Sequence, residues 1–146
     1  KLDAADLLLL QFPLWWFTMP AILKGWVDRV LAYGYAYGGQ RWYDQGVFKN
    51  KRAMLAVTTG GPDTAYGVDG LQGAIETILF PIHHGVLQFV GFEVAPAFVA
   101  FSANYSDEQR RAQVLDDYRR QLLEVFDAET LPAVKVADYG EDLRRL

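Results

Sequence analysis

The first hydrophobic segment of the chain runs from Asp6 to Phe17 and reads D-L-L-L-L-Q-F-P-L-W-W-F. It begins as an apolar run without polar alternation, the pattern of a strand buried on both faces in a mostly parallel sheet. The strand should stop at Pro13, because proline cannot donate a hydrogen bond to a ladder. Four large apolar residues follow as a loop, namely Leu14, Trp15, Trp16 and Phe17.

The rest of the chain alternates between helical and strand patterns, with two more strands predicted. Pro81 should split one helical region into two short helices, and Ser106, with Gln109 three residues later, forms a capping-box pattern. Pro96 indicates a bend or a sheet edge in the last strand. The predicted elements are a helix over 20–31, a strand over 53–57, helices over 71–79 and 81–89, a strand over 93–101 and a helix from Ser106 to about Asp127. This order predicts an α/β protein with helices on both faces of the sheet.

Candidate binding residues follow the first two predicted strands. In open α/β sheets ligands bind beside the loops that leave the carboxyl ends of the strands, so the apolar loop 14–17 suits a flat apolar ring. The same aromatics could instead cap the core or cover a dimer partner. Thr58, Thr59, Gly60 and Gly61 end the second strand, and glycines there let backbone N–H groups approach a ligand, although they are also ordinary turn residues.

The segment from Tyr33 to Asp44 alternates glycines with aromatic residues and is predicted to be a mobile loop that covers a pocket or a partner. His83 and His84 are the only histidines. Adjacent residues on a helix point about 100° apart and cannot both chelate one ion, so no metal site is expected.

Composition narrows the class of protein. With 146 residues and 51% hydrophobic residues, the chain should form a single domain. A net charge of -4 without a basic stripe argues against nucleic-acid binding. The absence of cysteine excludes disulfides and thiol chemistry, and no apolar run is long enough for a membrane span, so we expect a soluble cytoplasmic protein without membrane insertion. Residues 131–146 lack periodicity and should form an extended tail.

Three motifs together resemble the NAD(P)H:quinone oxidoreductase family of flavodoxin-like flavoproteins. They are F-P-L-W-W-F-T-M-P-A-I-L-K-G-W-V-D-R-V, T-T-G-G followed by Tyr66, and L-F-P-I-H-H-G-V-L-Q-F-V-G-F, in the family's order across about 6–126. The resemblance implies a doubly wound parallel sheet of order 2-1-3-4-5, of which this chain holds the third to fifth strands. The first two strands and the loop that binds the flavin phosphates would then lie outside this sequence. That expectation agrees with a core strand at the very start of the chain, whose other edge has no cover.

The resemblance also implies roles for single residues. Pro13, Leu14, Trp15, Trp16 and Phe17 would pack along the flavin ring, and Thr58, Thr59, Gly60 and Gly61 would form a second flavin loop with Tyr66 near the flavin carbonyl. Hydride arriving at flavin N5 leaves negative charge at the N1–C2 carbonyl end, which Gly60, Gly61 and Tyr66 would stabilise as catalytic donors. Tyr37, Trp42, Phe89 and Tyr105 would line the acceptor pocket, partly from the other subunit of a homodimer.

The implied activity is NAD(P)H-dependent, two-electron reduction of quinones or similar flat acceptors, with FAD as the cofactor and FMN as the alternative. Well-known mammalian members have a histidine six residues after the tyrosine, whereas this chain has Gln72. Glutamine can donate a hydrogen bond to the flavin carbonyl but cannot titrate near neutral pH. A second reading, from relatives of the same fold, is a regulatory or ancillary subunit of a potassium efflux system.

Overall fold

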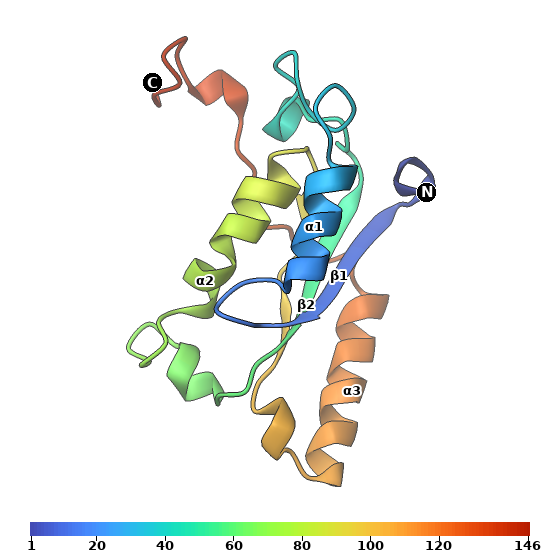
Figure 1. The fold of residues 1–146 in the computed structure, drawn as a ribbon, viewed down its shortest axis with the longest axis vertical. Helices are drawn as coiled ribbons and strands as arrows, with labels where there is room; N and C mark the ends of the chain where they lie inside the picture. Colours follow the sequence, from blue (N-terminus) through green and yellow to red (C-terminus); the bar gives the residue numbers. More distant parts are fainter.

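The computed structural model describes all residues from 1 to 146 and contains a four-stranded parallel sheet (Figure 1). Its strands are β1 (Leu7–Pro13), β2 (Arg52–Thr58), β3 (Glu93–Val94) and β4 (Phe98–Ala100). β2 is central, because β1 pairs along one edge of it, from Leu7 with Arg52 to Pro13 with Thr58, and β3 and β4 pair along the other. The predicted parallel α/β sheet is therefore confirmed.

The third predicted strand is present in two pieces. β3 and β4 both pair with β2, and the interruption between them contains Pro96, which lacks the N–H that a ladder requires. Ala95 keeps the register by donating its N–H to the carbonyl of Ala53 over 2.9 Å. The proline therefore interrupts the strand, and whether the chain also bends there stays a prediction.

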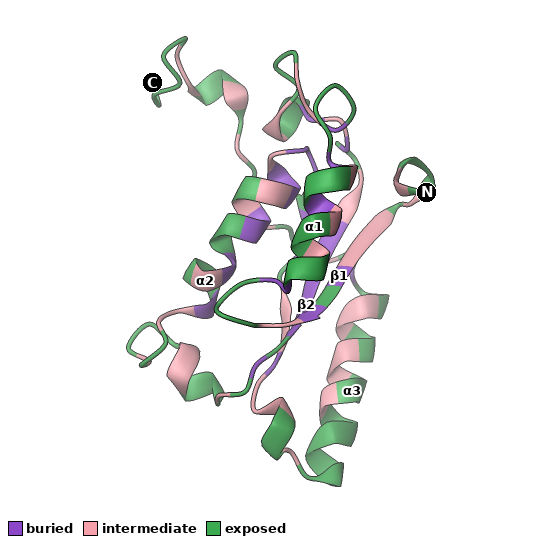
Figure 2. Ribbon diagram, in the orientation of Figure 1, coloured by how far each residue is buried: buried purple, intermediate pink, exposed green.

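Helices cover both faces of the sheet (Figure 1). α1 (Ala21–Val30) and α2 (Ile75–Ile82) share one face, and α3 (Glu108–Leu123) lies on the other. Figure 2 shows buried residues on α2 and none on α3, whose exposed side carries arginines and acids. Arg52 of β2 binds the segment that follows α3, because its Nη1 donates to the carbonyls of Val125 and Ala128 at 2.7 and 2.6 Å.

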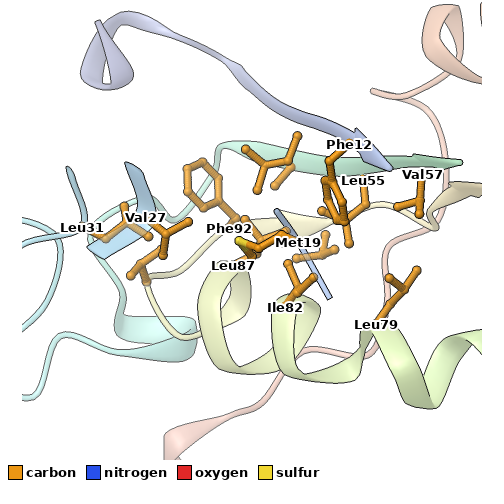
Figure 3. Close-up of a cluster of buried hydrophobic side chains, with 14 of the residues drawn as sticks. Phe12, Met19, Val27, Leu31, Leu55, Val57, Leu79, Ile82, Leu87 and Phe92 are labelled. Atoms are coloured by element: carbon orange, nitrogen blue, oxygen red, sulfur yellow. The ribbon is translucent and has the colours of Figure 1, made fainter. Parts of the chain in front are cut away.

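The main hydrophobic core fills the space between β2 and the first two helices (Figure 3). Alternate residues of β2 face this core, including Leu55 and Val57, while Met54 faces the smaller cluster under α3. Both faces of β2 are thus buried, as its continuous apolar run predicts.

β1 is less enclosed than predicted: Gln11 is exposed, and β1 pairs within the chain with β2 alone. Whether two further strands precede β1 stays a prediction.

The prediction of two helices separated at Pro81 is wrong. α2 continues through Pro81 to Ile82 and then widens into a π-helix over His83–Gln88. An interior proline costs a helix about 3 kcal/mol, but the apolar residues on both sides of it, Leu79 and Leu87, are fully buried against the sheet. Burial of this continuous face outweighs the local cost, and the widened turn adjusts the backbone after the proline.

The cap of the last helix also differs from the prediction. α3 begins one residue later than expected, with Asp107 as its N-cap, and the Asp107 carboxylate accepts the N–H of Arg110 at 2.7 Å. The Ser106 hydroxyl instead donates to the carbonyl of Ser102. Both residue types cap helices well, so the sequence pattern could not distinguish these neighbours.

Residues 131–146 contain one short 3₁₀ turn over Val136–Asp138 and an isolated bridge between Tyr139 and Arg145. That they form an extended tail stays a prediction. None of the helices has the length and apolar character that crossing a bilayer would require.

Candidate functional site

A tight turn directly follows β1 and carries the predicted aromatic residues. The N–H of Trp15 donates to the carbonyl of Thr18 at 3.1 Å, and the N–H of Thr18 donates back at 3.0 Å. Between them Trp16 and Phe17 adopt left-handed backbone angles, with φ of 51° and 60°. Bulky residues rarely adopt this conformation, which costs on the order of 1 kcal/mol each, and such strain is concentrated at functional sites.

The turn presents its rings to solvent instead of to the core. Trp15, Trp16 and Phe17 are 60%, 93% and 49% exposed, whereas Leu14 packs against the main core. The interpretation that these aromatics cap the core is therefore wrong for the three exposed residues. They form an apolar surface that a flat ligand or a partner could cover.

The loop after β2 lies beside this turn, since the N–H of Leu14 donates to the carbonyl of Thr58 at 2.9 Å. Thr59 is buried; its N–H donates to Ala100 and its hydroxyl donates to the carbonyl of Gly61 at 2.9 Å. Thr59 thus shapes the loop, while Thr58 and Gly60 are exposed at the surface.

Four backbone donors at these two strand ends have no acceptor within the protein. They are the N–H groups of Trp16, Phe17, Gly60 and Gly61. At Gly60 a Cβ would meet no heavy atom within 4 Å, so the space in front of this backbone is open. Free N–H groups next to exposed aromatic rings suit a planar ligand that carries hydrogen-bond acceptors on its edge.

Tyr66 and Gln72 lie in the loop that continues from these glycines. The Tyr66 ring packs over Gly61, where a Cβ would be 3.2 Å from the ring, and lies 5.8 Å from the ring of Phe101 between centroids. The N–H of Gln72 donates to the carbonyl of Ala65 at 2.8 Å, which holds Gln72 next to the Tyr66 segment. The Gln72 side chain is exposed and makes no hydrogen bond within the protein.

These residues fit a flavin ring. The exposed rings of 15–17 supply an apolar surface, the free N–H groups supply donors for carbonyl oxygens, and Gln72 supplies a further donor. The site would hold partial negative charge on the ligand's edge without a metal or a titrating side chain. Pro13, the last residue of β1, is half-buried and directly precedes the turn.

Three of the predicted acceptor-pocket residues gather at the other end of the sheet. The ring centroid of Phe89 lies 5.7 Å from that of Tyr37 and 6.2 Å from that of Trp42. In Figure 1 this aromatic segment, the cyan and teal loop before β2, lies at the amino ends of the strands, and the turn after β1 lies at the carboxyl ends. Within one chain the two groups of residues therefore do not share a pocket.

Tyr105 lies apart from that aromatic cluster. It follows β4, is 84% exposed, and borders a hollow of about 280 Å³ with Ser102 and Arg110 at the carboxyl edge of the sheet. It is therefore on the same edge as the flavin loops.

Sequence reasoning missed the pair formed by Tyr43 and His84. The Tyr43 hydroxyl lies 3.2 Å from His84 Nε2, and both side chains line a hollow of about 300 Å³ next to Trp42 and Phe89. The sequence signals were the membership of Tyr43 in the loop predicted to cover a pocket or a partner and its position next to the predicted pocket residue Trp42; no signal pointed to its pairing with His84. A larger hollow of about 690 Å³ between α2 and β4 is lined by none of the predicted site residues. No cluster of side chains suitable for a metal ion is present.

Comparison with known proteins places the chain in a family. The family model described as a flavodoxin-like fold matches residues 1–124. Rat (Rattus norvegicus) NAD(P)H dehydrogenase [quinone] 1 is 44% identical over 131 residues, which cover 90% of this chain and 48% of the rat protein. The chain thus spans about half the length of the curated relatives it matches.

Two solved structures are similar. A Klebsiella pneumoniae protein assigned as a quinone reductase superposes with a TM-score of 0.93 at 41% identity, covering 97% of this chain and 59% of that one. General stress protein 14 of Treponema denticola, solved in complex with FMN, has a TM-score of 0.66 at 31% identity, covering 84% of this chain and 66% of the other.

Proposed function

Because the chain belongs to the flavodoxin-like fold family, we propose that it binds a flavin at the carboxyl ends of β1 and β2 and serves as an NAD(P)H-dependent quinone oxidoreductase. The observation that carries this proposal is the set of four free N–H donors beside three exposed aromatic rings. The similarity to proteins named as quinone dehydrogenases or reductases supports the reaction. FAD is the proposed cofactor, and the neighbour solved with FMN supports a flavin of either kind.

The flavin would accept a hydride from NAD(P)H and deliver two electrons to a quinone or a similar flat acceptor. In this site Trp15, Trp16 and Phe17 would contact the ring and exclude water from one face. The N–H groups of Gly60 and Gly61 and the Tyr66 hydroxyl would hold the ring edge on which negative charge develops. Gln72 would donate a hydrogen bond there without moving a proton.

The acceptor-pocket residues at the amino edge lead us to include a homodimer in the proposal. Tyr37, Trp42 and Phe89 lie far from the flavin loops of their own chain, so they can line the acceptor pocket only by facing the flavin loops of a second copy. Tyr105, at the carboxyl edge, would contribute from the flavin-binding copy. Cytoplasmic localisation stays a prediction.

The test is to add FAD or FMN to the purified full-length protein and to follow the yellow flavin absorbance while NADH or NADPH is added without oxygen. We expect a bound flavin that bleaches on addition of one of them and recovers its colour on addition of a quinone. Failure to bind either flavin would refute the proposal. Flavin binding without reduction by NADH or NADPH would favour the ancillary-subunit reading over an enzyme.

Flavin affinities of two matched variants test whether the flavin lies against the turn after β1. Trp16→Ala removes a ring that is 93% exposed, so it should leave folding intact and weaken flavin binding at least about fivefold. Leu115→Ala removes a side chain that is 64% exposed on α3, away from both flavin loops, and should leave flavin binding unchanged. Equal affinities in the two variants would mean that the flavin does not lie against the turn.

A further inference from the structure

A small, largely apolar hollow of about 300 Å³ lies next to the aromatic cluster at the amino edge of the sheet. One side of it is formed by Trp42, Tyr43, His84 and Phe89. Four residues of the tail form the other side, namely Val134, Val136, Tyr139 and Leu143. Its volume is at the lower end of the range of small-molecule sites, which suits a ligand of one or two fused rings.

The tail wall of this hollow is held in place by specific polar contacts. The N–H of Leu131 donates to the carbonyl of Val94 at 2.7 Å, and the buried Gln88 side chain donates to the carbonyl of Pro132 at 2.9 Å. Further along, the N–H of Val136 donates to the Asp44 carboxylate at 3.0 Å. These hydrogen bonds fix the position of the tail, so the tail side of the hollow is a defined part of the structure.

One polar pair lies within this aromatic environment. The Tyr43 hydroxyl is 3.2 Å from His84 Nε2, and the His84 ring stacks on Phe80 with centroids 4.6 Å apart and planes 12° apart. The Tyr43 ring meets Phe89 edge to face at 5.6 Å. Burial, with a smaller contribution from Tyr139, raises the pKa of Tyr43, so the phenol stays protonated at neutral pH. Both rings are thus fixed, and their polar atoms face each other.

We infer that Tyr43, oriented by His84, holds the oxygen atom of a flat quinone-type ligand in this hollow. The choice of ligand class rests on the proposed function. The hydrogen bonding of the pair carries the inference, because His84 Nε2 either donates to the tyrosine oxygen or accepts its proton, according to the tautomer.

With the proton on Nε2, the Tyr43 O–H is free to donate to a quinone carbonyl. With the proton on Nδ1, Tyr43 donates to His84, and its oxygen accepts from a hydroquinone hydroxyl. His84 Nδ1 has no partner in the protein that would fix one tautomer. The pair can therefore donate to a carbonyl oxygen of the oxidised ligand and accept from a hydroxyl of its two-electron reduced form, whereas a fixed donor offers no acceptor for that hydroxyl proton.

The probes are 1,4-naphthoquinone and naphthalene, which have the same ring system with and without carbonyl oxygens. Their dissociation constants are measured by calorimetry on the flavin-loaded chain, which has no cysteine for the quinone to alkylate. Tyr43→Phe should weaken 1,4-naphthoquinone binding about fivefold, the equivalent of one hydrogen bond, and leave naphthalene binding unchanged. The matched control Tyr33→Phe changes a tyrosine that is 77% exposed and should alter neither constant.

The role of His84 is tested by a double-mutant cycle. His84→Ala should weaken 1,4-naphthoquinone binding more when Tyr43 is present than in Tyr43→Phe, because only the loss beyond the missing wall contact comes through the hydroxyl. Unchanged naphthoquinone binding in Tyr43→Phe would overturn the inference, and so would an equal loss for naphthalene.

Flavin reduction by NADH or NADPH, followed in the same samples, separates the two proposals. If wild-type protein and Tyr43→Phe both reduce their flavin but bind naphthoquinone equally well, the inference fails and the proposed function stands. If neither holds a reducible flavin, the proposed function fails.

Discussion

At the scale of single residues, two adjacent histidines have opposite environments. His84 is half-exposed and hydrogen-bonded to Tyr43, whereas His83 is buried and its Nε2 has no hydrogen-bond partner. Burial lowers the pKa of His83 from its usual 6.5 to about 4. The folded protein therefore keeps this imidazole neutral across the physiological range, which agrees with an apolar structural role and not with a proton relay.

His83 should make stability depend on pH. The pKa of His83 is lower in the folded state than in the unfolded state, so below pH 6.5 the unfolded chain gains a proton that the folded chain does not. The free energy of unfolding should therefore be highest above pH 6.5 and fall as the pH decreases to about 4. The loss should amount to about 3 kcal/mol in the free energy of unfolding. Urea unfolding from pH 7 to pH 4 should show a shallower decline in His83→Gln than in the wild type. His84→Gln is the control that retains His83, and an equally shallow decline in this control would contradict the assignment.

Much of the candidate site could be predicted at the level of residues, and some of it could not. An apolar run ending in Pro13 and a buried strand ending in Thr58–Gly61 placed both loops at the carboxyl ends of parallel strands, and the structure joins them through Leu14 and Thr58. The left-handed angles of Trp16 and Phe17 were not predictable, because bulky residues do not signal them. The Tyr43–His84 contact links residues 41 positions apart and required the fold.

At the scale of elements, burial of an apolar helix face determined where α2 ends, which the local sequence pattern could not predict. Pro81 is a strong local breaker, yet α2 passes through it because Ile75, Leu79 and Ile82 must face β2 together. The widened π-helix that follows brings His84 to the aromatic hollow and Gln88 to the tail. The rule that proline ends a helix could not predict that α2 continues through Pro81, because the rule does not include the free energy gained by burying the apolar face of the helix.

The start of α3 gives a prediction at this scale. Asp107→Ala removes the carboxylate that accepts the Arg110 N–H and should lower the free energy of unfolding by about 1 kcal/mol. Ser106→Ala removes only a bond to the Ser102 carbonyl and should cost less. The urea midpoints of unfolding of the two variants test this prediction. A larger loss of stability in Ser106→Ala than in Asp107→Ala would indicate that Ser106, the residue favoured by the sequence pattern, is the N-cap.

At the scale of the whole molecule, the fold separates two groups of aromatic residues. The exposed turn after β1 and the cluster of Tyr37, Trp42 and Phe89 lie at opposite ends of one sheet (Figure 1). The sequence predicted this sheet because strand patterns alternate with helical patterns along the chain. The sequence did not predict that the two groups of aromatic residues lie at opposite ends of the sheet, because this separation follows from the three-dimensional fold. The proposed homodimer is the arrangement that brings them together, with a flavin loop from one copy and an aromatic wall from the other.

Mixing two impaired variants tests that arrangement. Trp16→Ala damages the flavin turn, and Tyr37→Ala damages the aromatic wall, and both are compared at a flavin concentration below the dissociation constant of Trp16→Ala, where each alone should have a reduced quinone reductase rate. If each site combines two copies, an equal mixture refolded together should exceed the mean rate of the two variants by up to about a quarter of the wild-type rate, since half of the dimers are mixed and one of their two sites is intact. Sites built within single chains would give no recovery, and the dimer proposal would then be wrong.

The central claim is that a flavin ring lies over the turn after β1, with its carbonyl edge toward the paired glycines. A crystal structure of the flavin-loaded protein measures this most directly. We predict that the ring contacts Trp15, Trp16 or Phe17, and that flavin oxygen or nitrogen atoms lie within hydrogen-bond distance of the N–H groups of Gly60 and Gly61. A ring bound elsewhere, or a turn that folds its own side chains over those N–H groups, would contradict the account.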